Sequence, residues 1–434
     1  MAAPAERLLA DAGLARDEAG ELRMGGVPLR VVASAVGTPT YVYHAGVIRE
    51  RYQALSAALA DLPHTLCYAV KANSTLAVLR LLADQGAGAD IVSGGELERA
   101  LRAGFLPDRI VFSGVGKDDA ELESAVRAGL GQVNVESVEE AGRLAAVAAR
   151  LGGETRVGLR VNPDVTTETH PYISTGKHGI KFGIPADQVG EAAALVAASP
   201  GLRLTGLAVH LGSQLLHTAP YAEALQRLVE LLPRVQEAAG GTVESLGLGG
   251  GLGIRYTGLE ETIAPEAFAA AVAPALRSTG LHLHLEPGRC LVGSAGVLLA
   301  RVLYRKHSGG RDFVIVDAAM NDLVRPSHYG AHHEIVPVGP PAAGRLRADV
   351  VGPICETGDF LALDRDLPDL VAGDLVAVLG AGAYGFAMSS QYNSRPRAAE
   401  VLVDGGRWGT CRARETFDDL VRGETATPLG GGAS

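Results

Sequence analysis

Short β-branched runs alternate with longer amphipathic stretches from Thr65 onward, and this alternation constrains the fold more than any other feature. The runs have the length of strands, and the stretches between them carry apolar residues at helical spacing, which is typical of βα units around a parallel sheet. Eight candidate strands are LCYAVKA (66–72), ADIVS (89–93), RIVFSG (109–114), QVNVES (132–137), RVGLRVN (156–162), LTGLAVHLGS (204–213), SLGLGGG (245–251) and LHLHLE (281–286). Eight such units predict a closed (β/α)8 TIM barrel, with an open doubly wound sheet as the alternative.

The pattern changes after Arg289, where strand-like runs follow one another without long helices between them. These runs cover 296–304, 312–319, 347–353, 374–382 and 398–406. They predict a β-rich second domain of the β-sandwich or β-barrel type, with which the strand-like TYVYH (40–44) could pair. We therefore expect an N-terminal segment (1–38) packed on the β domain, a barrel (39–289), a β-rich domain (290–422) and a flexible tail (423–434).

Charge and cysteine usage exclude several classes of partner. The 434 residues hold 39 Lys and Arg against 49 Asp and Glu, and a net charge of -10 disfavours nucleic-acid and anionic membrane partners. No apolar run is long enough to span a bilayer, and the amino terminus lacks the apolar core of a signal peptide. The four cysteines are scattered without the paired spacing of a metal site. We expect a cytoplasmic protein with reduced thiols and no bound metal.

A lysine, Lys71, stands near the end of the first predicted barrel strand, in Ala69-Val70-Lys71-Ala72-Asn73. Barrel enzymes carry their active sites at the C-terminal ends of the strands. A surface lysine whose stem lies along apolar neighbours is the ordinary interpretation of such a residue. The functional interpretation is a Schiff-base lysine, whose amine is nucleophilic where its surroundings favour the neutral form.

Two further strand ends favour the functional interpretation. Gly249–Gly253 follows the seventh strand and exposes backbone N–H groups, as a phosphate site requires. Glu286-Pro287-Gly288-Arg289 ends the eighth strand and supplies an arginine. Loops after strands seven and eight are the recurring phosphate site of such barrels, so the two motifs together predict a bound phosphate group.

The motifs YAVKAN, HLGSQ, GLGGGLG, EPGR, GPICETGD and GAYGFAMSSQYNSRPR, between about residues 37 and 404, resemble the motif series of the pyridoxal-phosphate decarboxylases with the alanine-racemase-like fold. The resemblance implies that Lys71 holds the aldehyde of pyridoxal 5'-phosphate and that Glu286 faces its pyridine nitrogen. It implies that His210, otherwise an ordinary core histidine, stacks on the ring, and that Asp90 is an acid near the lysine. The implied phosphate ligands are Ser213, Gly251, Gly288, Arg289 and Tyr384.

Cys355 lies in Gly352-Pro353-Ile354-Cys355-Glu356, and an isolated cysteine in such a strand is usually an inert small hydrophobe. The resemblance instead implies that Cys355 returns a proton after carbon dioxide leaves. In that family the cysteine comes from the second subunit, so a homodimer with shared active sites is expected.

Three features resemble the branch of that family that acts on diaminopimelate. They are HPYISTG (170–176) followed by KFG (181–183), RPSHY (325–329), and glutamate rather than aspartate after the cysteine. An arginine can bind a distal carboxylate bidentately, and Glu356 can accept from an ammonium group. The expected substrate contacts are Arg289, Arg325, Tyr329, Glu356 and Tyr384.

The implied reaction is the conversion of meso-diaminopimelate to L-lysine and carbon dioxide, the last step of lysine biosynthesis. The alternatives are a decarboxylase of another amino acid, ornithine-like, arginine-like or carrier-linked, and a pyridoxal-phosphate-binding homologue without catalysis. A racemase fits less well, because the cysteine motif is of the decarboxylase type.

Overall fold

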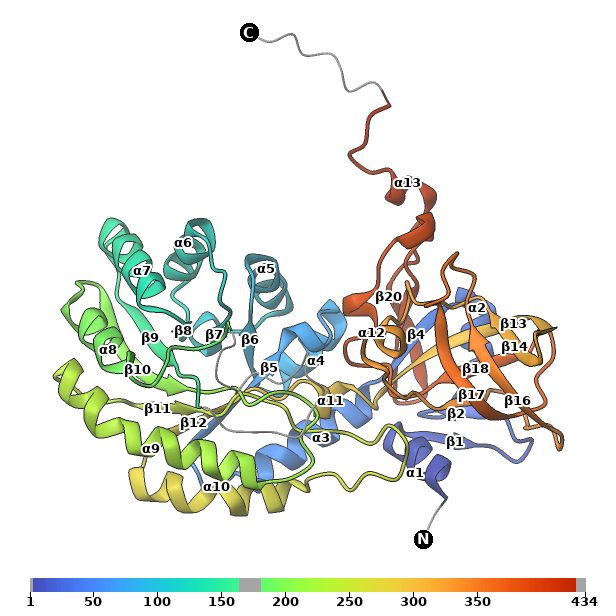
Figure 1. Ribbon diagram of the computed structural model, residues 1–434, viewed down its shortest axis with the longest axis horizontal. Coiled ribbons are helices and arrows are strands. Elements are labelled where there is room, and N and C mark those ends of the chain that lie inside the picture. The colour runs from blue at the N-terminus through green and yellow to red at the C-terminus, as the bar shows by residue number, and fades with distance from the viewer. Residues whose placement is uncertain (1–2, 164–180, 427–434) are drawn as a thin grey trace.

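A closed barrel of eight parallel strands forms the larger part of the structure (Figure 1), a computed structural model that describes residues 3–163 and 181–426. Its strands are β5 (His64–Ala69), β6 (Gly88–Ile91), β7 (Ile110–Phe112), β8 (Gln132–Val135), β9 (Thr155–Arg160), β10 (Leu202–Ala208), β11 (Ser245–Gly247) and β12 (His282–Leu285). All eight predicted strands are present, so the TIM barrel is confirmed and the open sheet is excluded. The strands end earlier than predicted, and Lys71 lies in the 3-10 turn η1 (Val70–Ala72) after β5.

Helices cover the outside of the barrel and connect successive strands (Figure 1). They are α3 (Ala45–Ala58), α4 (Leu76–Asp84), α5 (Gly94–Ala103), α6 (Asp119–Ala128), α7 (Val138–Leu151), α8 (Val189–Ala198), α9 (Ala219–Ala239), α10 (Pro265–Thr279) and the short α11 (Arg289–Val292). Capping side chains set the residues at which several of these helices begin. Ser93, Asp118 and Ser137 accept hydrogen bonds from backbone N–H groups in the first turns of α5, α6 and α7.

The second part is a nine-stranded, mostly antiparallel sheet. Its strands are β4 (Thr40–His44), β13 (Gly296–Ser308), β14 (Arg311–Val316), β15 (Ile335–Pro337), β16 (Arg345–Val351), β17 (Phe360–Pro368), β18 (Leu375–Val378), β19 (Ala399–Asp404) and β20 (Arg407–Arg412). The β-rich second domain is therefore confirmed. Sequence patterning did not identify β17, whose charged alternation DRD resembles a loop, or β15 and β20. The short helices α12 (Arg325–Tyr329) and α13 (Phe417–Leu420) complete this part.

The N-terminal segment packs on this second sheet. It forms α1 (Pro4–Asp11), α2 (Leu29–Val36) and the small sheet of β1 (Leu14–Arg16), β2 (Leu22–Met24) and β3 (Val27–Pro28). Its buried apolar side chains share one core with Val297, Leu299 and Val336 of the larger sheet. Because β4 pairs with β13 and β19, we propose that the barrel domain begins after β4 rather than at residue 39.

Two sequence expectations concern residues outside the described part of the chain. The HPYISTG segment (170–176) lies there, and so do residues 427–434 of the expected tail. Within the described residues, no helix combines the length and apolar character needed to cross a membrane. The described side chains also include no group of three or more His, Cys, Asp or Glu residues arranged to hold a metal ion.

One buried carboxyl group, that of Asp322, is incompletely satisfied. One of its oxygens accepts a hydrogen bond from the backbone N–H of Ala319 at 3.0 Å, and the other has no partner among the described residues. The phenol of Tyr41, on β4, donates to the Asp322 carbonyl at 2.6 Å. Burial raises the pKa of the Asp322 carboxyl to about 7.

We predict that Asp322→Asn stabilises the protein at alkaline pH. The folded-state pKa lies above the unfolded one, so the stability that this group contributes is present below about pH 4 and is lost as the pH rises through 7. An amide avoids that loss, so its gain over wild type should be about 4 kcal/mol larger at pH 8 than at pH 4. Thermal unfolding at both pH values measures the difference. Exposed Asp61→Asn is the control, and an equal shift at both pH values would contradict the prediction.

Candidate active site

A cavity of about 560 Å³ lies at the C-terminal end of the barrel, where barrel enzymes carry their active sites. Its lining includes Lys71, Ser113, Asn134, Arg160, His210 and Glu286. These residues come from the ends of six different strands or from the turns that follow them. Strand closure therefore brings together Lys71, His210 and Glu286, which the sequence predicted as site residues.

Lys71 forms an ion pair with Asp90 at the cavity wall. Its Nζ donates to Asp90 Oδ2 at 2.5 Å, while the other oxygen of this fully buried carboxylate has no hydrogen-bond partner among the described residues. Burial lowers the pKa of the Lys71 amine, but the Asp90 carboxylate and weaker contributions from other acidic groups raise it more, so it lies above its ordinary value. The Asp90 carboxylate, within hydrogen-bond distance, therefore favours the charged form of this amine.

Glu286 lies directly after β12 and is 7% exposed. Burial raises the pKa of its carboxyl above the ordinary value, and the negative charge of Asp90 raises it further. The charges of Lys71 and Arg160 act in the opposite direction. Glu286 thus holds a proton more tightly than an exposed glutamate does, at the position expected to face a ring nitrogen.

His210 follows β10 and lines the same cavity. The backbone N–H of Gly250 donates to His210 Nδ1 at 3.2 Å, so this nitrogen carries no proton. Burial lowers the pKa of His210 well below its ordinary value, and the charges of Arg160 and Lys71 lower it further. His210 is therefore a neutral imidazole, held in one tautomer by the glycine turn.

The glycine turn after β11 approaches neighbouring backbone too closely for side chains. A Cβ atom on Gly250 would lie 2.1 Å from the carbonyl oxygen of Glu286, and one on Gly251 would lie 2.4 Å from that of Gly212. Gly249 and Gly251 also have positive φ angles, +64° and +95°. Only glycine fits these positions, so the turn presents an unobstructed backbone beside the end of β12.

Arg289, at the start of α11, is buried next to the glycine turn. Its Nη2 donates to the hydroxyl of Ser213 at 2.8 Å, and its Nη1 donates to the phenol of Tyr256 at 2.5 Å. The guanidinium also lies 4.8 Å from the ring centre of Tyr384, whose backbone N–H donates to the carbonyl of Ala72. The expected phosphate ligands Ser213, Arg289 and Tyr384 are thus in contact.

A second buried arginine, Arg325 on α12, shares a partner with Arg289. Its guanidinium lies 5.0 Å from the ring centre of Tyr256 and 5.9 Å from that of Tyr329. Its Nε donates to His333 Nε2 at 3.3 Å. The expected substrate contacts Arg289 and Arg325 therefore both contact Tyr256, a residue that the sequence analysis missed, and Tyr329 lies beside Arg325. The place of Tyr256 shortly after the GGGLG turn was the available signal.

Arg160, the last residue of β9, is a second residue that the sequence analysis missed. Its Nη1 donates to Glu136 at 2.7 Å, and its guanidinium lies 5.0 Å from the ring centre of Phe182. Glu136 also accepts from the backbone N–H of Gly114. No motif contains Arg160, so the available signal was only a charged residue at the end of a predicted strand.

Cys355 and Glu356 do not join this arrangement within one chain. Both lie in the exposed turn between β16 and β17, and neither lines the described Lys71 cavity. The backbone N–H of Cys355 donates to Asn393 Oδ1 at 2.8 Å, and the Tyr392 phenol is hydrogen-bonded to Glu356. The structure thus separates the predicted proton donor from the predicted cofactor lysine.

Known proteins are similar to this chain over nearly its whole length. The family described as "Pyridoxal-dependent decarboxylase, pyridoxal binding domain" matches residues 45–293. A diaminopimelate decarboxylase of Pseudomonas aeruginosa is 51% identical over 94% of this chain and 98% of its own length. One of Aquifex aeolicus is 46% identical over 93% of this chain and 95% of its own. The solved diaminopimelate decarboxylase of Helicobacter pylori complexed with L-lysine matches with a TM-score of 0.87 and 40% identity, covering 91% of this chain and 98% of that one.

We predict that Tyr256→Phe weakens the binding of pyridoxal phosphate while leaving the fold intact. The phenylalanine keeps the ring between the two arginines but removes the oxygen that accepts from Arg289. A hydrogen bond to a charged group contributes about 1.5–3 kcal/mol, so affinity should fall roughly tenfold or more. Fluorescence titration of the cofactor-free protein measures this. Exposed Tyr304→Phe is the control, and an unchanged affinity in Tyr256→Phe would contradict the assigned role.

Proposed function

This chain belongs to the pyridoxal-dependent decarboxylases, and we propose that it removes the carboxylate at the D-configured centre of meso-diaminopimelate, giving L-lysine and carbon dioxide. One observation carries the choice of substrate. Two buried arginines contact one tyrosine close to the Lys71 cavity, in a chain that is 51% identical to a diaminopimelate decarboxylase. One arginine suits a phosphate and the other a distal carboxylate.

The residues around Lys71 fit pyridoxal phosphate. The glycine turn presents backbone without side chains, because a Cβ atom on Gly250 or Gly251 would collide with neighbouring backbone, and the Asp90 oxygen without a partner lies beside the lysine. Lys71 would hold the aldehyde, Glu286 would face the ring nitrogen and His210 would lie on the ring face. The phosphate would be held by Ser213, Gly251, Gly288, Arg289 and Tyr384. When bound, the cofactor supplies an electron sink for the pair released with carbon dioxide.

The chain's own residues would control the protons around this reaction. Asp90 fixes the Lys71 amine by the 2.5 Å ion pair, so the nitrogen is oriented before substrate arrives. The raised pKa of Glu286 lets it keep or share a proton with a ring nitrogen. His210 is neutral and already accepts from Gly250, so it packs and orients rather than transferring protons.

The far end of the substrate would bind at the second arginine. Arg325 is fixed by His333 and by the Tyr256 and Tyr329 rings, so its planar guanidinium is oriented before a carboxylate arrives. Tyr384 and Arg289, which contact each other, would lie between the substrate and the phosphate of the cofactor. Glu356 would accept from the distal ammonium group. Lysine and ornithine lack the distal carboxylate and would leave Arg325 without its ionic partner.

We further propose that the active site is completed by a second copy of the chain. Cys355 would return the proton to the carbon that loses carbon dioxide, yet within one chain it lies on an exposed turn away from the Lys71 cavity. A two-fold dimer would place Cys355 and Glu356 of each copy beside Lys71 of the other.

The metabolic setting is part of the same proposal. Because the proposed reaction yields L-lysine, the enzyme would catalyse the last step of lysine biosynthesis. All four cysteines are free thiols, which suits a reducing compartment such as the cytoplasm.

Release of carbon dioxide from a panel of amino acids tests the substrate assignment. We predict that kcat/KM for meso-diaminopimelate exceeds that for lysine, ornithine and arginine by roughly tenfold to a hundredfold, because a buried arginine without its partner costs about 1–3 kcal/mol. Arg325→Gln should raise KM for meso-diaminopimelate, whereas the exposed Arg347→Gln should not. Equal turnover of ornithine would overturn the substrate and leave the family assignment intact.

Hybrid dimers test the shared site. Lys71→Ala and Cys355→Ala variants should each be nearly inactive. After subunit exchange, about half of the dimers would be hybrids, each with one site that lacks both groups and one native site. About a quarter of wild-type activity should therefore return. Mass spectrometry of tagged chains verifies the exchange. Verified exchange without recovered activity would show that both groups come from one chain.

A further inference from the structure

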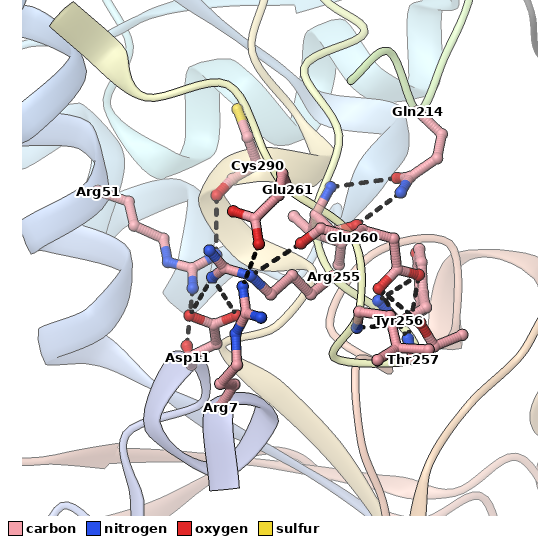
Figure 2. Close-up of polar contacts among 12 residues, drawn as sticks. Arg7, Asp11, Arg51, Gln214, Arg255, Tyr256, Thr257, Glu260, Glu261 and Cys290 are labelled. Atoms are coloured by element: carbon pink, nitrogen blue, oxygen red, sulfur yellow. Dashed lines mark hydrogen bonds and ion pairs between the residues drawn. The ribbon is translucent and has the colours of Figure 1, made fainter. Parts of the chain in front are cut away.

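A second cavity, of about 160 Å³, lies behind the glycine turn and separate from the Lys71 cavity. It is bounded by α3, by the start of α10 and by the segment that follows β11. Its apolar walls include Leu55, Leu252, Ile263, Phe268 and Leu291. Figure 2 shows the polar groups that gather on one side of this region, next to α1.

Arg51, on α3, is a cation in the wall of this cavity. Among the described residues, no carboxylate forms a hydrogen bond or ion pair with it. Its Nη1 donates to the carbonyl of Cys290 at 3.1 Å and its Nη2 to that of Asp11 at 2.7 Å (Figure 2). Both acceptors are backbone oxygens. Arg51 is half-buried, and a guanidinium partly removed from water normally has an anionic partner, so this one is matched only in part.

The neighbouring charges are already engaged with one another. Arg255 donates to both oxygens of Asp11, at 3.1 and 3.0 Å, and Arg7 pairs with Glu261 at 2.9 Å. Glu260 accepts from the Thr257 hydroxyl and from nearby backbone N–H groups. Each carboxylate in Figure 2 therefore has its donors, and none of them binds Arg51.

The inner wall holds a second unsatisfied polar group. Ser294 lines the cavity and is 4% exposed, and its hydroxyl has no hydrogen-bond partner among the described residues. The space itself has the size of a small ring, since a cavity of about 150 Å³ lined by Leu, Ile and Phe binds benzene. Apolar walls, a polar end and this volume together define the chemistry of a ligand.

We propose that this cavity binds a small monocarboxylate with a ring-sized apolar body, whose carboxylate pairs with Arg51. The apolar body fills the space between Leu55 and Phe268, and the guanidinium supplies the charge-assisted hydrogen bonds. The ligand would lie against Gly253 and Ile254, which continue the glycine turn, and against Cys290, which follows Arg289. This site is distinct from the substrate arginines and does not depend on which amino acid the enzyme decarboxylates.

Benzoate and its neutral isostere benzamide test the site by calorimetric titration of the cofactor-loaded protein. Benzoate should bind roughly tenfold more tightly than benzamide, because only benzoate pairs with a cation. Arg51→Gln should bring benzoate down to the affinity of benzamide and leave benzamide unchanged. Arg277→Gln, on α10 but outside the cavity, is the matched control and should bind benzoate as wild type does.

A second pair of variants keeps the test independent of Arg51. Ala54 is exposed on α3 and lines the cavity, so Ala54→Phe should fill the space and abolish binding of both compounds. Ala57→Phe, exposed on the same helix but off the cavity, should retain binding. Arg325→Gln should also retain it, which separates this site from the active site. Absence of benzoate binding to wild type, binding that survives Ala54→Phe, or loss on Arg325→Gln alone would overturn the proposal. If Arg51→Gln fails to fold, the Ala54 and Ala57 pair decides.

Discussion

Closure of the barrel between its first and last strands is the constraint on which the site depends. β12 pairs in parallel with β5, with Leu285 opposite Leu66, and the backbone N–H of Ala69 donates to the carbonyl of Pro287. This pairing brings the turn that contains Glu286 against the turn that contains Lys71. The neighbouring pair of β5 and β6 places Asp90 opposite Ala69. Strand register therefore fixes the distances between charged groups that lie far apart in the sequence.

The buried charged groups around Lys71 influence one another's protonation. Lys71 stays protonated because Asp90 is adjacent, and Glu286 has a raised pKa partly because Asp90 already carries a negative charge. The positive charge of Arg160 lowers the pKa of Glu286, and Glu136 positions Arg160 by accepting a hydrogen bond from it. The site is thus a network in which removal of one member leaves another uncompensated.

The segment after β11 joins the barrel to the β-rich domain. Its glycines approach the end of β12, and its Tyr256 contacts one arginine of the barrel and one of the second domain. Arg255, one residue earlier, instead binds Asp11 of the N-terminal helix. Adjacent residues of one loop therefore contact three parts of the chain, so the positions of Arg289 and Arg325 relative to each other depend on this loop.

The sequence by itself determined the barrel, the β-rich domain and the family, because strand periodicity, glycine turns and ordered motifs are local properties. The comparisons confirm the family and the structure confirms the fold. The sequence did not predict Tyr256, Arg160 or the charged state of Lys71. Only the tertiary structure decided these, because ion pairing, burial and hydrogen bonding depend on which distant strand ends the closed barrel brings together.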